Sequence, residues 1–253
     1  MKRLGLLITA ALLLLPVLCA GQAKVYTRKA KLEDFTVKIT KVVTDGQALV
    51  EINLRDEVTS RWRISSFEFI STGEYERIKN DNNYYFLRLI SDGGLAFLSL
   101  EKGGKEEDAD RLKRPFEIAR IPIGATGMFL GADIIYMGAF LDIIQEYTLN
   151  AIASDKSGYL GLETCNFKNL KGKSVCLVGD EADSAYAEQR PDTLVPVCFA
   201  PAPGGEWCYK MLIDAETHEL MYFNKVKYKS EGDEAISDKD IANFKTRHAV
   251  LIR

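Results

Sequence analysis

The sequence contains only two histidines, His218 and His248, and it lacks the common motifs of catalytic sites. A zincin helix needs a second histidine four residues after the first, and the segment ETHEL around His218 lacks it. Neither a Gly-x-Ser-x-Gly nucleophile elbow nor a glycine-rich phosphate loop is present. The sequence therefore predicts a protein that is not an enzyme, with no catalytic residue, no metal ligand and no cofactor.

An excess of charge is also missing, since 33 Lys and Arg face 36 Asp and Glu, a net charge of −3. This balance excludes charge-driven binding of nucleic acid. Acidic clusters at 106–110, 179–183 and 231–234 lack the spacing of a calcium loop and are interpreted as solvated loops. A carboxylate pair for glycoside hydrolysis forms through the fold rather than along the chain, so a hydrolase stays open as a third hypothesis.

Five cysteines are present, and four of them follow the first 23 residues: Cys165, Cys176, Cys198 and Cys208. An even number in an exported chain predicts two disulfides. Three pairings are open, and sequential pairing is preferred because turn residues lie between the members of each neighbouring pair. A zinc site of four thiolates is the alternative, but no Cys-x-x-Cys spacing supports it.

The N-terminus has the layout of a secretory signal peptide, with Lys2 and Arg3 before an apolar stretch at 4–18 and small residues after it. Cleavage after Ala20 or Ala23 is expected, which leaves 24–253 as a single domain in the periplasm. Leu18 stands where lipid anchoring through Cys19 requires a small residue, and this argues against an anchor. The apolar content of 47% is typical of a globular protein.

Alternation of apolar and polar residues predicts strands in both halves of the chain. The segments FTVKITKVV and ALVEINLRDEV flank an Asp-Gly turn and predict a hairpin, which opens a meander that continues through WRISSFEFI, EYERI, YYFLRLI and LAFLSL. The charged stretch 102–120 is interpreted as an exposed connection. A second antiparallel set follows in GYLGLETC, KSVCLVGD, TLVPVCFAP, EWCYKMLID and ELMYFNKVKYK, and Ser237 to Asp240 is a capping pattern for a short C-terminal helix.

The segment 121–147, IPIGATGMFLGADIIYMGAFLDIIQEY, is nearly long and apolar enough to span a membrane. Basic residues precede it and acidic residues follow it, so an exported chain would place the basic flank outside, against the positive-inside tendency. We expect instead a glycine-rich entry up to Gly131 and a helix over 132–149. Apolar side chains cover most of its circumference, so this helix must be enclosed, either as ordinary core or beside a cavity or lid for an apolar ligand.

The order of these elements, with DFTVKITKVVTDG early, GLETCNFKNLKGKSVCLVGD later and the hairpin YKMLIDAETHELMYFNKVKYK, resembles the outer-membrane lipoprotein-carrier (LolA-like) superfamily over about residues 34–245. The resemblance implies an α+β, mostly β fold: a strongly curved antiparallel sheet, or half-barrel, that encloses one apolar helix. It also implies that acyl chains of lipoproteins or lipids bind between sheet and helix. From position and polarity, the expected lining of such a cavity is Met128, Phe129, Ile135, Tyr136, Phe140 and Ile144.

The leading hypothesis is therefore a periplasmic carrier that does not span the membrane. It binds a lipid, a lipoprotein or another apolar ligand and catalyses no reaction. The alternative is an envelope β-protein with a filled core that acts through a protein partner.

Overall fold

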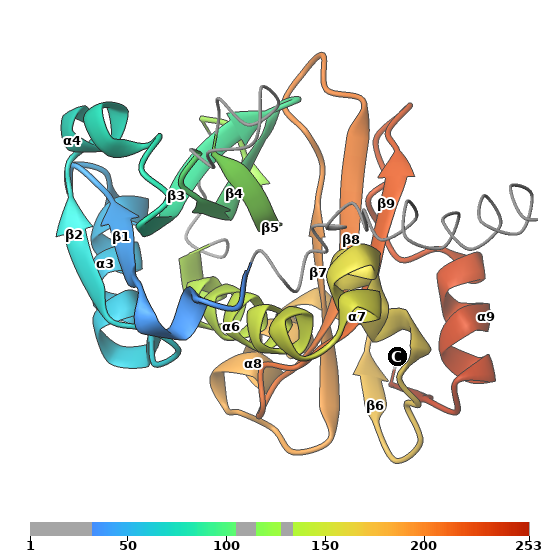
Figure 1. Ribbon diagram of the computed structural model, residues 1–253. Helices are drawn as coiled ribbons and strands as arrows, with labels where there is room; N and C mark the ends of the chain where they lie inside the picture. The colour runs from blue at the N-terminus through green and yellow to red at the C-terminus, as the bar shows by residue number, and fades with distance from the viewer. Residues whose placement is uncertain (1–31, 105–114, 128–133, 253) are drawn as a thin grey trace, which may run out of the picture.

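The fold is that of a computed structural model, which describes residues 32–104, 115–127 and 134–252 (Figure 1). These residues form two five-stranded sheets and six α-helices. The first sheet contains, in spatial order, β2 (Phe67–Ile70), β1 (Ile39–Val43), β3 (Tyr84–Asp92), β4 (Leu95–Lys102) and β5 (Phe116–Ala125). The second contains β10 (Val250–Ile252), β6 (Ser174–Cys176), β7 (Thr193–Phe199), β8 (Trp207–Asp214) and β9 (Leu220–Lys227).

Helices connect and cover these strands. The α-helices are α3 (Leu49–Arg61), α4 (Thr72–Ile78), α6 (Met137–Ala153), α7 (Asp155–Leu160), α8 (Gly179–Ala187) and α9 (Asp238–Thr246). Two 3-10 helices are η1 (Phe35–Val37) and η2 (Gly161–Phe167). The β8–β9 hairpin and the short C-terminal helix agree with the sequence-based expectation. The mostly β composition does not, because six α-helices form among the described residues where two were expected and the fold is mixed α/β.

The two sheets have the same pattern of strand directions. In each, the first two pairings are parallel and the last two are antiparallel. The parallel edge strand comes from different places in the chain, because β2 is the next strand after β1, with α3 between them, whereas β10 is the last strand and follows α9. Parallel neighbours need crossover connections, and helices supply them.

The half-barrel expectation is wrong, because neither sheet is strongly curled or closed and the strands are divided between two sheets. The expected first hairpin is also replaced: ALVEINLRDEV lies within or beside α3, whose buried residues Val50, Leu54 and Val58 recur every four positions. Glu51 accepts hydrogen bonds from the backbone N–H of Gln47 and Ala48 and caps this helix. A helical period and a capping carboxylate outweigh the Asp-Gly turn signal.

Other segments also form helices where the sequence predicted strands or loops. EYERI belongs to α4, and GLETC lies in η2 rather than in a strand. The acidic stretch 179–183 forms the start of α8. Asp180 and Glu181 lie in its first turn, where a negative charge interacts favourably with the helix dipole and stabilises the helix. Of the stretch 102–120, residues 105–114 lie outside the described part of the chain, and β5 begins at Phe116.

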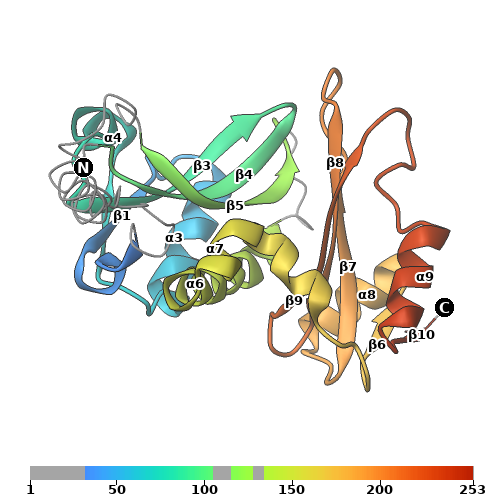
Figure 2. The same ribbon diagram turned by 45° about the vertical axis from the view of Figure 1, so that its right-hand side comes forward.

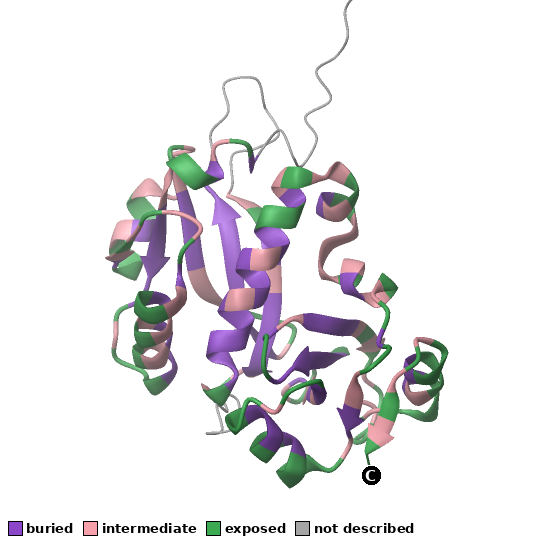
Figure 3. Cartoon of the chain, turned by 90° about the horizontal axis from the view of Figure 1, so that it is seen from below, coloured by how far each residue is buried: buried purple, intermediate pink, exposed green. Residues whose placement is uncertain are grey.

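Helix α6 lies at the junction of the two sheets and packs on α3 and β5 (Figures 1 and 2). Eleven of its 17 residues are buried. A single core cluster runs from Val42 and Leu98 of the first sheet through α6 to Val195 and Met211 of the second. Figure 3 shows the buried residues gathered on the strands and on the inner sides of the helices. The helix expected over 132–149 therefore exists, shifted toward the C-terminus, and is enclosed as its composition requires.

A smaller core lies on the other face of the second sheet, where α9 packs (Figure 2). Phe244 of α9 is fully buried there, with its ring 5.0 Å from that of Tyr222. Both faces of the second sheet are thus covered, one by α6 and the first sheet and the other by α9.

Candidate functional site

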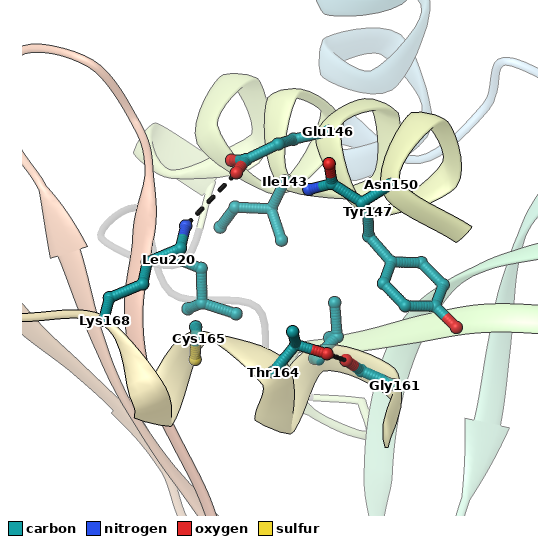
Figure 4. Close-up of a pocket in the computed structure, with 10 residues that line it drawn as sticks. Ile143, Glu146, Tyr147, Asn150, Gly161, Thr164, Cys165, Lys168 and Leu220 are labelled. Carbon is teal, nitrogen blue, oxygen red and sulfur yellow. Dashed lines mark hydrogen bonds and ion pairs between the residues drawn. The ribbon is translucent and has the colours of Figure 1, made fainter. Parts of the chain in front are cut away.

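A small pocket lies beside α6, where the helix faces η2 and β9 (Figure 4). Ile143 and Tyr147 of α6 and Leu220 of β9 give it an apolar floor, and its cavity volume is about 50 Å³. The residues that line it are Ile143, Glu146, Tyr147, Asn150, Gly161, Leu162, Thr164, Cys165, Lys168 and Leu220. The pocket therefore adjoins the apolar helix that the sequence singles out.

The wall opposite α6 is fixed by a chain reversal at Gly161. This residue has φ of +64°, a left-handed conformation that glycine adopts without steric cost, and it ends α7 where η2 begins. The Tyr147 hydroxyl donates to the carbonyl of Gly158 at 3.0 Å and holds α7 against α6. Thr164 Oγ1 donates a hydrogen bond to the Gly161 carbonyl at 2.7 Å, so this carbonyl at the turn has a partner within η2 itself.

The rim of the pocket is charged. Lys168 Nζ lies 3.2 Å from Glu146 Oε1 and 2.6 Å from Glu219 Oε1, and Figure 4 shows the lysine directed toward Glu146. Burial opposes the charge of Lys168, but its hydrogen bonds to Glu219 and Glu146 outweigh burial and raise its pKa. The ion pairs therefore favour the charged form of the lysine, which ties η2 to both α6 and the β8–β9 turn.

Arg247 holds the far end of η2. Its Nε donates to the Lys168 carbonyl at 2.8 Å, and its Nη2 donates to the carbonyls of Cys165 and Met221 at 3.1 and 2.7 Å. Two of these carbonyls lie at the C-terminal end of η2, where helical carbonyls lack partners further along the helix, and the third belongs to β9. Burial lowers the pKa of Arg247. The pocket wall is thus clamped to the second sheet by backbone contacts.

The Cys165 thiol in the pocket is chemically quiet. Burial raises its pKa to about 12, although Lys168 and Arg247 favour the thiolate. A neutral thiol is a poor nucleophile and a poor metal ligand. Within the described residues no group of three or more His, Cys, Asp or Glu could hold a metal ion. The arrangement can bind an apolar group, but it carries no activated nucleophile.

The predicted lining residues fall mostly elsewhere. Met128 and Phe129 lie outside the described residues. Ile135 is 45% exposed, whereas Tyr136, Phe140 and Ile144 are buried in the main core at 5%, 0% and 0%. The structure brings these last three together, with the rings of Tyr136 and Phe140 6.4 Å apart, but none of them lines the pocket. The face that does line it repeats at Ile143, Tyr147 and Asn150, a helical spacing that the sequence displays but that nothing local marks as a site.

The cysteine prediction is corrected by the structure. Cys165, Cys176, Cys198 and Cys208 are free thiols. Cys165 lies in η2, so no hairpin joins it to Cys176 in β6. The β7–β8 hairpin exists, but its register pairs Cys198 with Lys210 rather than with Cys208. The seven residues between these strands set that register, and it displaces the two cysteines along the ladder.

The segment LIDAETHEL, which carries the resemblance, forms the β8–β9 turn. Asp214 Oδ1 accepts hydrogen bonds from the backbone N–H of Glu216 and Thr217 at 3.1 and 3.0 Å, and Asp214 Oδ2 lies 2.8 Å from Lys173 Nζ. Burial opposes ionisation, but Lys173 and the Thr217 N–H lower the pKa of Asp214. Its role is structural, since it fixes the turn that carries His218.

His218 joins a polar cluster that the sequence does not reveal. Its Nδ1 lies 2.7 Å from Asp142 Oδ2 of α6, and Arg61 of α3 approaches the same carboxylate oxygen at 3.1 Å. Tyr186 of α8 stacks on the imidazole with ring centroids 5.4 Å apart. These residues come from distant parts of the chain, so no local pattern signals them. They connect four elements from both halves of the molecule.

A carboxylate pair does form, on the outer face of the first sheet. Glu101 and Glu117 are cross-strand partners in β4 and β5, and Ser99 Oγ lies 3.5 Å from an oxygen of each. Burial and then repulsion by Glu101 raise the pKa of Glu117, against the attraction of Arg120. Arg88 binds Glu101 through two nitrogens at 3.0 and 2.9 Å, which commits that carboxylate to an ion pair.

Comparison with protein families, with curated proteins and with solved structures finds no match for this chain. None of the described helices combines the length and the apolarity that crossing a bilayer requires. The fold and the pocket are therefore the basis on which function is inferred.

Proposed function

We propose that the protein is an exported, non-enzymatic binding protein whose ligand inserts an apolar chain end into the pocket beside α6. The observation that carries this proposal is the apolar floor of Ile143, Tyr147 and Leu220 under a charged rim. Such a site suits a ligand with a hydrocarbon tail and a polar head, because the tail is desolvated while the head stays at the rim.

The size of the cavity limits how much of the tail is bound in the resting structure. A volume of about 50 Å³ has room for only a few heavy atoms. Each methylene removed from water contributes about 0.8 kcal/mol, so the resting pocket supports weak binding. Tighter binding requires η2 to move away from α6, with Gly161 as the residue at which the chain can turn.

The first test is a titration of the purified chain with a fluorescent undecanoic acid, followed by displacement with oleate. We expect saturable binding that strengthens as the fatty acid lengthens. Leu162→Trp fills the cavity, and removing room for two methylenes costs about 1.6 kcal/mol, or roughly fifteenfold in affinity. Leu177→Phe is the matched control, since Leu177 is a partly buried leucine that packs on the other core cluster.

Equal loss of affinity in both leucine variants would mean that the effect is general destabilisation and not occlusion of the pocket. Absence of fatty-acid binding, together with absence of co-purified lipid in native mass spectrometry, would contradict the proposal.

A second candidate is action through a protein partner, and one observation favours it. Two elements that line the pocket, and α7 between them in the chain, also expose large apolar side chains: Leu149 of α6, Tyr159 of α7 and Phe167 of η2, the last at 79%. Where exposed apolar side chains form one contiguous patch, the patch commonly marks an interaction site. Phe167→Ser should then abolish capture of an envelope partner by the tagged chain while fatty-acid binding is retained.

A further inference from the structure

A larger cleft lies between the two sheets, at the tips of two hairpins. Its volume is about 310 Å³, and it shares no residue with the pocket beside α6. The β3–β4 turn, β4 and β5 of the first sheet form one side, and the β7–β8 loop with β8 and β9 of the second sheet forms the other. The side chains that carry the following argument are Asp92, Phe97, Arg120, Glu206, Trp207 and Lys225.

The rim of this cleft is held by backbone contacts between the two hairpins. The Gly94 carbonyl accepts hydrogen bonds from the N–H of Ala202 at 2.8 Å and of Thr126 at 3.0 Å. The backbones of the two hairpin tips lie so close together that a Cβ on Gly205 would be 2.3 Å from the carbonyl oxygen of Gly93. The cleft is therefore preformed, and a ligand does not have to order its walls.

An aromatic surface lines one side. Trp207 is 40% exposed at the start of β8, and Lys225 Nζ lies 4.6 Å from the centroid of its ring. Behind it the rings of Tyr209 and Phe97 meet edge to face at 5.6 Å, and the Arg120 guanidinium covers Phe97 at 4.6 Å. Lys225 is placed over the indole of Trp207, and 40% of the residue remains exposed, where a flat, CH-rich ligand surface can cover it.

The charges in the cleft cancel. Asp92 and Glu206 supply two carboxylates, and Arg120 and Lys225 supply two cations, with Arg120 Nη1 2.8 Å from Asp92 Oδ2. A cleft with no net charge does not select an anion or a cation. Carboxylates that accept and cations that donate match hydroxyl groups, because each hydroxyl is both donor and acceptor.

We propose that this cleft is a saccharide-binding site that takes one neutral sugar ring stacked on Trp207, with its hydroxyls bound by the surrounding charged side chains. The volume is at the small end of ligand pockets, about 300–1,000 Å³, which fits a single ring or the end of a chain. This site is independent of the apolar pocket and would remain if no fatty acid bound.

The test is calorimetric titration of the full chain, with tryptophan fluorescence in parallel, against neutral oligosaccharides of glucose, xylose, mannose, galactose and N-acetylglucosamine. Oligogalacturonate and a heparin fragment serve as anionic probes. The chain has two tryptophans, and Trp62 is 2% exposed, so a ligand-induced change in emission reports on Trp207. We expect at least one neutral oligosaccharide to bind and to shift the emission.

Trp207→Ala should weaken that binding at least tenfold, and Glu206→Gln should weaken it severalfold. Phe167→Ala is the control, because it removes an exposed aromatic ring outside the cleft. Circular dichroism of each variant establishes that the fold is retained. The proposal is overturned if no neutral probe binds, if the anionic probes bind in preference, or if folded Trp207→Ala binds as the unaltered chain does.

Discussion

At the scale of single residues, the cysteines are apolar packing groups. Cys165 and Cys176 belong to the main core, and the Cys208 thiol contacts the carbonyl of Val226 at 3.6 Å. Burial raises the pKa of Cys198 to about 12, although Met211 and Lys210 favour its thiolate. Buried thiols of this kind behave as small hydrophobic side chains. Their presence does not report on the redox state of the compartment.

These pKa values predict slow alkylation in the native state. At pH 8 a thiol with a pKa near 12 has roughly a thousandfold less thiolate than one with the ordinary value of about 8.5. Iodoacetamide should therefore leave Cys165 and Cys198 unmodified in the folded chain and modify both in 6 M guanidinium, as peptide mass spectrometry will show. Recovery of disulfide-linked peptides from unreduced native protein would contradict this expectation.

The site illustrates what residue types alone cannot predict. The sequence identifies an apolar helix that must be enclosed, and α6 is enclosed. Which of its residues meet a cavity depends on η2 and Leu220, which approach from elsewhere in the chain. His218 lies in the β8–β9 turn with a φ of +60°, and its contact with Asp142 arises only because α6 crosses that turn.

At the scale of elements, α9 is attached through one buried carboxylate. Asp240 Oδ2 accepts hydrogen bonds from Ser237 Oγ at 2.6 Å and from Lys210 Nζ at 3.1 Å, while Oδ1 accepts one from the Tyr222 hydroxyl at 2.5 Å. Burial disfavours its charge, but hydrogen bonds from Ser237, Tyr222 and Lys210 dominate and lower the pKa of Asp240 to about 2. The same residue therefore caps the helix and docks it on the sheet.

Because the folded-state pKa of Asp240 is below its unfolded value, its contribution to stability is present above about pH 4 and is lost as pH falls toward 2. Asp240→Asn leaves Lys210 buried without its counter-charge and should cost about 3–5 kcal/mol in urea unfolding at pH 7. The difference between the two proteins should shrink between pH 4 and 2. Asp238→Asn, at an exposed position in the same helical turn, should cost less than about 1 kcal/mol.

An element can be predicted from the sequence when neighbouring residues determine it, and less well when packing against distant segments determines it. The capping pattern at Ser237 and the hairpin β8–β9 are set by neighbouring residues, and both are correctly predicted. The segment ALVEINLRDEV fits both an alternating spacing, which predicts a strand, and a four-residue spacing, which predicts a helix. The Glu51 cap favours the helix, and packing against α6 gives Val50, Leu54 and Val58 a buried face that the alternating pattern would not provide.

At the scale of the whole molecule, the described residues of the two sheets meet at several places, and two of these junctions are held by polar contacts. One is α6 with the cluster of Arg61, Asp142 and His218, and the other is the contact between the hairpin tips. Both junctions share the continuous core that runs between the sheets. Perturbing the hairpin contact should therefore lower the stability of the molecule and not merely loosen a loop.

Gly205→Ala tests this directly. Its Cβ would lie 2.3 Å from the Gly93 carbonyl oxygen and 2.4 Å from Pro201 Cβ, so backbone must move, and overpacking of this kind costs about 1–3 kcal/mol. Gly179→Ala is the matched control, since a Cβ there meets no atom within 4 Å, and it should change stability by less than about 0.5 kcal/mol. Urea unfolding followed by circular dichroism and by tryptophan emission measures both variants. Equal midpoints for the two would show that the hairpin contact does not join the sheets energetically, whereas a lower midpoint for Gly205→Ala in both signals would show that it does.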